Sequence, residues 1–247
     1  MKEEYEGDSE FYNAYWDRTR FRALEVSKNL KRLEFKRLIG THVHPGGDVL
    51  DVGCGTGDLA ATLKSRYRIT AFDFSEKTIQ RNQFRITGVR FLCRNVLDPP
   101  PNNEVEKFDA VTCMDVIEHL PFEKQGALIR NVASYLKLGG ILVISTPDRD
   151  QALRYKVNPK QTDEDFLKQY EGQPRADCLT KKEFENLLQG TFRIKCRSAV
   201  SPTVTRRSID LLWKVFAVTV GYRGVNIITN RFGIPARYII RAAIKVR

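Results

Sequence analysis

The chain has 247 residues, of which 42% are hydrophobic, and its 41 Lys and Arg against 30 Asp and Glu give a formal net charge of +11. This length allows one α/β domain with a complete core, with or without a small appendage. No stretch reaches about 18 consecutive apolar residues, which argues against a membrane-spanning helix, and no signal-peptide pattern follows Met1. We therefore expect a cytoplasmic protein with a single domain over residues 1–247.

The five cysteines show no C-x-x-C spacing, which argues against a zinc site or a disulfide framework. Three of them, Cys54, Cys93 and Cys113, fall in predicted strands or in a glycine turn. We expect them to be reduced thiols of the core.

The N-terminal part, residues 10–39, is predicted to form one or two helices that end at Gly40 and a following Pro-Gly-Gly turn. An aromatic patch that includes Tyr12 and Trp16 lies at its start. These rings are candidates for ligand contact, although packing of the helix on the core is an equal or better explanation.

A glycine turn between a strand and a helix is the most informative stretch. The apolar run Val49–Val52 breaks at Gly53, Gly55 and Gly57 and continues into a helical pattern. A strand, a glycine turn and a helix form a nucleotide-binding unit, because glycines let a ligand lie against the backbone. The sixth position from Gly53 is an aspartate, so the dinucleotide fingerprint G-x-G-x-x-G is not met. Asp51, at the strand end, would repel a pyrophosphate and attract a ligand with an amino group and a sulfonium.

The second strand, Tyr67–Phe72, ends at Asp73, which lies 22 positions after Asp51. A carboxylate at the tip of this strand can accept hydrogen bonds from both hydroxyls of a ribose. Ser75 is then expected to cap a helix over residues 76–84.

Two further strands are predicted over Val89–Cys93 and Phe108–Met114. The first is followed by Asn95, whose carbonyl oxygen can accept a hydrogen bond from an adenine amino group, with Asp98 as a rival. The second leads directly into Asp115.

The rest of the chain alternates helices and strands. We expect a helix over Glu123–Leu136, a turn at Leu138–Gly140 and a strand over Ile141–Thr146. Residues 148–176 are polar and irregular, and they form either a cover over the substrate site or a disordered loop. A T-x-x-E capping box predicts a helix over Lys181–Leu188, and strands are expected over residues 192–200 and 238–245, the last one antiparallel.

The pattern acid-x-G-x-G-x-G from Asp51 to Gly57 resembles motif I of the class I S-adenosylmethionine (SAM) methyltransferases. The resemblance covers roughly residues 10–200. It implies an α/β, Rossmann-like sheet of seven mostly parallel strands, with helices on both faces and one reversed edge strand. It also implies SAM as cofactor and S-adenosylhomocysteine (SAH) as product. The cofactor-binding residues that it implies are Arg32, Asp51, Gly53, Cys54, Gly55, Gly57, Asp73, Phe74, Asn95, Val96 and Asp115.

Two shorter runs resemble the ubiquinone-pathway O-methyltransferases. The run Asn29–Leu33 is similar to their N-P-x-R-L segment, in an N-terminal helix that serves as a lid over the cofactor at about residues 10–40. By this resemblance Arg32 pairs with the cofactor carboxylate; a plain surface cation is the alternative. In Asp115–Pro121, the resemblance places His119 beside the methyl group, as base for a hydroxyl; a loop histidine bonded to backbone is the alternative.

The same segment resembles the small-RNA 3′-terminal ribose methyltransferases, in which E-x-x-E-H and a later histidine bind a metal. Here Asp115 replaces the first glutamate, and no histidine follows His119. The resemblance therefore implies no complete metal site, although Asp115, Glu118 and His119 could hold a weakly bound divalent ion.

The C-terminal part is strongly basic: residues 203–247 contain nine Lys and Arg and one acid, Asp210. Within the insertion at about 203–233, the stretch 206–232 combines bulky apolar groups with arginines, as an amphipathic helix at an anionic membrane surface does. Packing on the sheet or on a dimer partner is the alternative.

We predict O-methylation of a hydroxyl on a small apolar or lipid-linked molecule, with possible peripheral contact at the inner face of a membrane. The basic C-terminus keeps RNA methylation open, although no RNA-binding module is recognisable. A non-catalytic SAM-binding protein is the third alternative, against which the intact motif residues argue.

Overall fold

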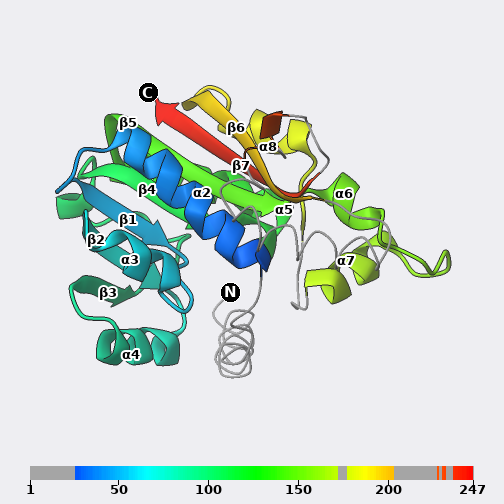
Figure 1. The fold of residues 1–247 in the computed structure, drawn as a ribbon, viewed down its shortest axis with the longest axis horizontal. Coiled ribbons are helices and arrows are strands. Elements are labelled where there is room, and N and C mark those ends of the chain that lie inside the picture. Colours follow the sequence, from blue (N-terminus) through cyan, green and yellow to red (C-terminus); the bar gives the residue numbers. More distant parts are fainter. Residues whose placement is uncertain (1–25, 172–176, 203–226, 228–229, 232–235, 247) are drawn as a thin grey trace.

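The computed structural model describes residues 26–171, 177–202, 227, 230–231 and 236–246 (Figure 1). The expected lid helix before residue 26, with Tyr12 and Trp16, lies outside these ranges. Most of the basic stretch 206–232 also lies outside them. Among the described helices, none is long and apolar enough to cross a bilayer.

The described strands form one seven-stranded sheet in the order β3-β2-β1-β4-β5-β7-β6. Neighbouring strands run parallel except β7, which is antiparallel to both β5 and β6. The strand bounds are β1 Asp48–Val52, β2 Arg68–Asp73, β3 Val89–Cys93, β4 Phe108–Met114, β5 Leu136–Pro147, β6 Phe192–Pro202 and β7 Ala236–Lys245. The predicted fold is confirmed, but the expectation of a reversed edge strand is wrong. β7 lies between β5 and β6 because it pairs with both along its length, and β6 forms the edge.

Helices cover both faces of the sheet, and each face has its own apolar cluster. The described helices are α2 Val26–His42, α3 Asp58–Leu63, α4 Glu76–Arg85, α5 Phe122–Tyr135, α6 Arg149–Leu153, α7 Asp163–Glu171 and α8 Lys181–Leu188, with 3₁₀ turns η2 Asn102–Glu104 and η3 Ile117–His119. One cluster joins the sheet to α2, α3 and α4, and the other joins it to α5 and α8. Figure 1 shows α2 lying across the face of the sheet.

Several boundaries differ from the sequence prediction. α2 continues through Gly40 to His42, since the amide of Val43 still donates to Ile39 O (2.9 Å) and a single glycine costs a helix only about 1 kcal/mol. The expected turn at Leu138–Gly140 is an irregularity within β5, because β4 pairs with β5 on both sides of it. The expected irregular stretch 148–176 contains α6 and α7.

All five cysteines are free thiols, but their burial differs from the prediction for Cys93. This side chain is exposed because β3 is an edge strand of the sheet, whereas Cys113 on the central strand β4 is buried. Cys54 is half-buried in the glycine turn.

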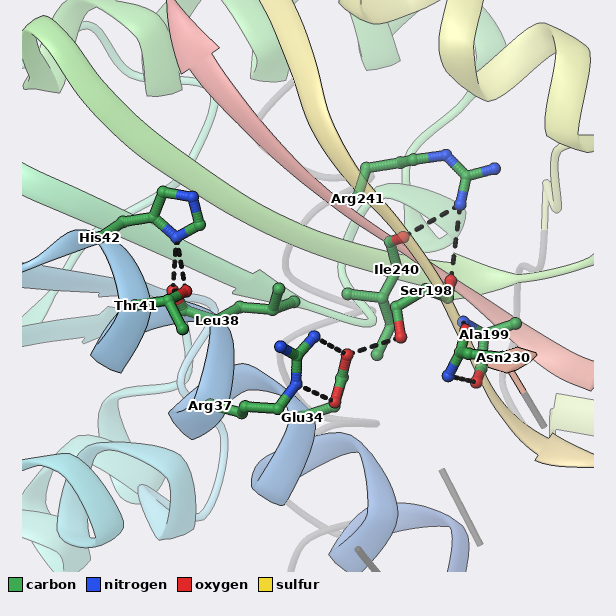
Figure 2. Close-up of polar contacts among 10 residues, drawn as sticks. All are labelled: Glu34, Arg37, Leu38, Thr41, His42, Ser198, Ala199, Asn230, Ile240 and Arg241. Carbon is green, nitrogen blue, oxygen red and sulfur yellow. Dashed lines mark hydrogen bonds and ion pairs between the residues drawn. The ribbon is translucent and has the colours of Figure 1, made fainter. Parts of the chain in front are cut away.

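A buried polar contact joins α2 to β6, the strand at the edge of the sheet (Figure 2). Glu34 is 3% exposed and accepts a hydrogen bond of 2.6 Å from the hydroxyl of Ser198 on β6. Arg37 donates to both carboxylate oxygens of Glu34, at 2.9 and 2.6 Å. On the same strand, the side-chain amide of Asn230 pairs with the backbone of Ala199. Of these contacts, the bond from Ser198 to Glu34 joins α2 directly to β6, the edge strand of the sheet.

Candidate active site

The turn between β1 and α3 is a tight backbone cradle. Gly53, Gly55 and Gly57 have φ angles of 65°, 47° and 72°, a region that favours glycine. A Cβ atom on Gly53 would lie 2.5 Å from Val116, and one on Gly57 would lie 2.9 Å from Ile86. Gly53 and Gly57 are therefore required both by their conformation and by the close approach of neighbouring side chains, and Gly55 is favoured by its conformation.

Asp51 lies at the end of β1 beneath this cradle, and it is almost fully buried. Its Oδ1 accepts a hydrogen bond of 2.8 Å from the hydroxyl of Thr112 on β4. Its Oδ2 is buried and has no hydrogen-bond partner among the described residues. Burial raises the pKa of Asp51 to about 7, and the nearby carboxylate of Asp73 adds to this effect. The hydrogen bond from Thr112 and the backbone amide of Ala60 oppose it. A buried carboxylate oxygen without a donor is costly, so this position suits a ligand that brings a cationic donor.

Asp73 lies at the tip of β2, on the other side of the cradle. Its Oδ2 accepts from the backbone amide of Gly55 at 2.9 Å, and its Oδ1 accepts from that of Ser75 at 3.0 Å. Burial raises the pKa of Asp73, and the hydrogen bonds from the backbone partly offset this effect. Each carboxylate oxygen can accept a second hydrogen bond, which leaves capacity for a diol.

Sequence reasoning missed Asn82, which holds the turn from below. Its side chain is buried in α4, and its Nδ2 donates to Gly55 O at 2.7 Å. Sequence reasoning also missed Thr112, which donates to Asp51. A single polar residue in a helix or strand gives no sequence signal until the fold shows what it faces.

Arg32 extends from α2 toward the start of α3. Its guanidinium lies 3.8 Å from the carboxylate of Asp58, the first residue of that helix, and its side chain is part-exposed. Arg85 approaches the same carboxylate at 3.5 Å. The structure therefore brings Arg32 to the helix that follows the glycine cradle.

The loop after β3 is organised by its own hydrogen bonds. Asn95 Oδ1 accepts from the backbone amide of Leu97 at 2.9 Å, and Asn131 on α5 donates to Val96 O at 3.0 Å. Phe74 O receives a contact from the thiol of Cys93 at 3.5 Å. Asn95 and Val96 are both half-buried. They follow Arg94, whose backbone amide donates to Asp73 O at the tip of β2 (3.0 Å).

Asp115 follows β4 and has a φ of 56°, in the left-handed region that non-glycine residues rarely adopt. Its Oδ2 forms an ion pair with Lys31 from α2, and its Oδ1 accepts a hydrogen bond of 2.7 Å from the hydroxyl of Ser145 on β5. The ammonium of Lys31 also lies 3.5 Å from the ring centroid of Tyr238 on β7. The sequence did not single out Lys31, because its neighbour Arg32 carried the resemblance.

His119 ends η3, four residues after Asp115. Its ring is 19% exposed, and its Nε2 lies 4.0 Å from a carboxylate oxygen of the fully buried Glu118. Within the described ranges, no group of three or more His, Cys, Asp or Glu side chains is arranged to hold a metal ion. Asp115, Glu118 and His119 therefore do not converge on one point.

The methyltransferase-domain family matches residues 16–191, which is well over half of the chain. The chain belongs to this methyltransferase family. It is 34% identical over 145 residues to a ubiquinone biosynthesis O-methyltransferase of Xanthomonas axonopodis pv. citri, a match that covers 57% of this chain. The chain spans about three-fifths of the length of that relative, 59%.

Two solved methyltransferases share the fold at low identity. The N-methyltransferase NodS of Bradyrhizobium japonicum, crystallised with SAH, has a TM-score of 0.63 and 12% identity, over 96% of this chain and 99% of that one. The 1,6-didemethyltoxoflavin-N1-methyltransferase of Burkholderia thailandensis has a TM-score of 0.62 and 17% identity, over 100% of this chain and 91% of that one. These similarities establish the fold of this methyltransferase but not its acceptor.

Proposed function

We propose that this methyltransferase uses SAM to methylate a hydroxyl group of a small apolar or lipid-linked molecule, leaving SAH. When bound, SAM supplies a methyl group on a positively charged sulfonium. The observation that carries the proposal is the orphaned Oδ2 of Asp51, which lies under a glycine cradle and needs a cationic donor. The α-ammonium of SAM is such a donor.

The remaining groups of the cradle fit the other parts of the cofactor. Asp73 has two oxygens with spare capacity for the ribose hydroxyls, and Asn95 retains a second lone pair for the adenine amino group. We propose that Arg32 on α2, whose guanidinium lies near Asp58 at the start of α3, pairs with the cofactor carboxylate. We propose the backbones and side chains of the following residues as the remaining contacts: Gly53, Cys54, Gly55, Gly57, Phe74 and Val96.

The choice of oxygen as the methylated atom rests on the relative from Xanthomonas, whose name states an O-methyltransferase. The two structural neighbours are N-methyltransferases, so the fold alone does not decide between oxygen and nitrogen. This chain's contribution to the transfer is to hold the acceptor in line with the methyl group and to exclude water. The resemblance to the ubiquinone-pathway O-methyltransferases makes His119 a candidate for contact with the acceptor hydroxyl and for removal of its proton.

The basic C-terminal stretch 206–232 supports a second part of the proposal, which is contact with an anionic membrane surface. Residues 203–247 carry nine basic groups against one acid, and an apolar or lipid-linked acceptor would be found at such a surface.

The test of the function combines binding and transfer. Calorimetry with SAM and SAH measures whether the wild-type protein binds the cofactor and whether Asp51→Asn loses this binding. Incubation with cell extract and labelled SAM, followed by separation of lipid, small-molecule, RNA and protein fractions, identifies the acceptor class. Label in the RNA fraction alone, or undetectable SAM binding, would refute the proposal.

A further inference from the structure

A buried ion pair joins α2 to the carboxyl ends of β4 and β5. Lys31 is 2% exposed, and its ammonium is paired with Asp115 and stacked on the ring of Tyr238. Ser145 donates to the other oxygen of the same carboxylate. Lys31 on α2 and Ser145 on β5 therefore meet at one carboxylate, and Tyr238 on β7 contacts the ammonium, although the chain separates Lys31 from Asp115 by 84 positions.

The residue that follows Asp115 joins this cluster to the cofactor cradle. Val116, the next residue, packs so closely on Gly53 that a Cβ there would lie 2.5 Å from it. The side chain of Asp115 retains 23% exposure, whereas that of Lys31 is only 2% exposed. Each oxygen of Asp115 has one bond within the protein and can accept a second. The strained φ of Asp115 shows that the surrounding contacts hold this residue in a fixed orientation.

Burying a lysine is costly, and the cost is offset only when its charge is paired and its donors are satisfied. A core position of α2 would be filled more simply by an apolar residue, as the buried neighbour Leu30 shows. The cation is therefore best explained by its effect on Asp115, which it keeps compensated and oriented.

We propose that Asp115, which the resemblance assigns to the cofactor, instead binds the hydroxyl of the methyl acceptor and takes its proton, with Lys31 as the residue that positions this carboxylate. The inference rests on the proposed function and deepens it. In the transfer, the acceptor oxygen forms a bond to the methyl carbon while the bond from that carbon to sulfur breaks. The sulfonium becomes a neutral thioether, and the hydroxyl proton passes to Asp115 instead of His119.

The pairing also defines which acceptors the site takes. An unpaired carboxylate would attract a protonated amine, but the charge of Asp115 is already compensated by Lys31. A second cation at this point would be repelled by the ammonium of Lys31. The site therefore favours a neutral hydroxyl over an amine.

The test uses three variants and one matched control. The variants are Asp115→Asn, Lys31→Met and the double variant, and the control is Lys36→Met, at an exposed lysine of the same helix. Each protein is measured for its melting temperature, its affinity for SAH by calorimetry, and its transfer of label from SAM to hydroxyl compounds of cell extract. Asp115→Asn tests the proposal even if Lys31→Met fails to fold.

We expect all variants to bind SAH within about threefold of wild type, because the cluster serves the acceptor. Asp115→Asn lowers transfer by about 100-fold, the scale for loss of a general base. Lys31→Met lowers it by about 10-fold or more, and the double variant is no worse than Asp115→Asn, because Lys31 acts through that carboxylate. Lys36→Met behaves as wild type.

Three results would overturn the inference while leaving the function intact. These are transfer by Asp115→Asn within threefold of wild type, losses that multiply in the double variant, or a loss of SAH affinity above tenfold in Asp115→Asn. Wild-type protein that fails to bind SAH, or that labels no fraction, would instead reject the proposed function and this inference with it.

Discussion

The buried carboxyl group of Asp51 is expected to lower the free energy of unfolding of the ligand-free protein near neutral pH. The same group is expected to bind the cofactor. Burial raises its pKa from the ordinary value of 3.8 to about 7. Between these two pH values the unfolded chain releases a proton that the folded chain retains, so rising pH favours unfolding. The difference between the two pKa values corresponds to roughly 4 kcal/mol, which is an upper limit on the free energy of unfolding that is lost by about pH 7.

Asp51→Asn removes this penalty while keeping the shape of the side chain and an oxygen for the bond from Thr112. The variant should therefore melt at a higher temperature than wild type at pH 8 and show little advantage at pH 4. It should also bind SAH at least tenfold more weakly, because an amide cannot compensate the α-ammonium. Thermal melting at the two pH values and calorimetry on both proteins measure these effects.

The cofactor should reverse the pKa shift of Asp51. Because its ammonium stabilises the ionised carboxylate, SAH affinity should rise as pH increases from 5.5 to 7.5, with release of a proton below pH 7. Calorimetry in buffers of different ionisation enthalpy detects that proton. Affinity independent of pH over this range, or a lower melting temperature of Asp51→Asn at pH 8, would refute the reasoning.

Three further predictions concern the other parts of the site. Asp73→Ala should weaken SAM binding by about 1–3 kcal/mol, the cost of losing charged hydrogen bonds, and unchanged affinity in calorimetry would contradict the ribose role. His119→Ala should leave SAH affinity within about threefold of wild type and reduce transfer less than Asp115→Asn does. A loss of transfer of about 100-fold would indicate that His119, and not Asp115, accepts the hydroxyl proton. The stretch 206–232 should make the protein float with anionic but not neutral liposomes, in a salt-sensitive manner, and competitor RNA run in parallel should not displace it. Flotation should be lost when four basic residues are replaced together: Arg206, Arg207, Lys214 and Arg223.

Local signals explain why much of the fold could be predicted. The strands Val89–Cys93 and Phe108–Met114 and the helix Lys181–Leu188 have the predicted bounds. Each is marked by neighbouring residues: an apolar run that ends at polar residues, or a threonine and a glutamate three positions apart. The capping box at Thr180 forms as expected, with both of its hydrogen bonds present. Such signals survive folding because they act within one turn or one strand.

The sequence by itself determined the glycine cradle, Asp51, Asp73 and the family to which the chain belongs, because these features lie on consecutive elements and require particular backbone conformations. Only the tertiary structure decided that β7 lies inside the sheet and that Thr112 and Asn82 support the cradle. It alone decided that Lys31 meets Asp115, since an ion pair between residues 84 positions apart depends on how a helix crosses a sheet. No periodicity along the chain predicts how the helix crosses the sheet. The apolar pattern of the helix and that of each strand are the same whether or not the two residues meet.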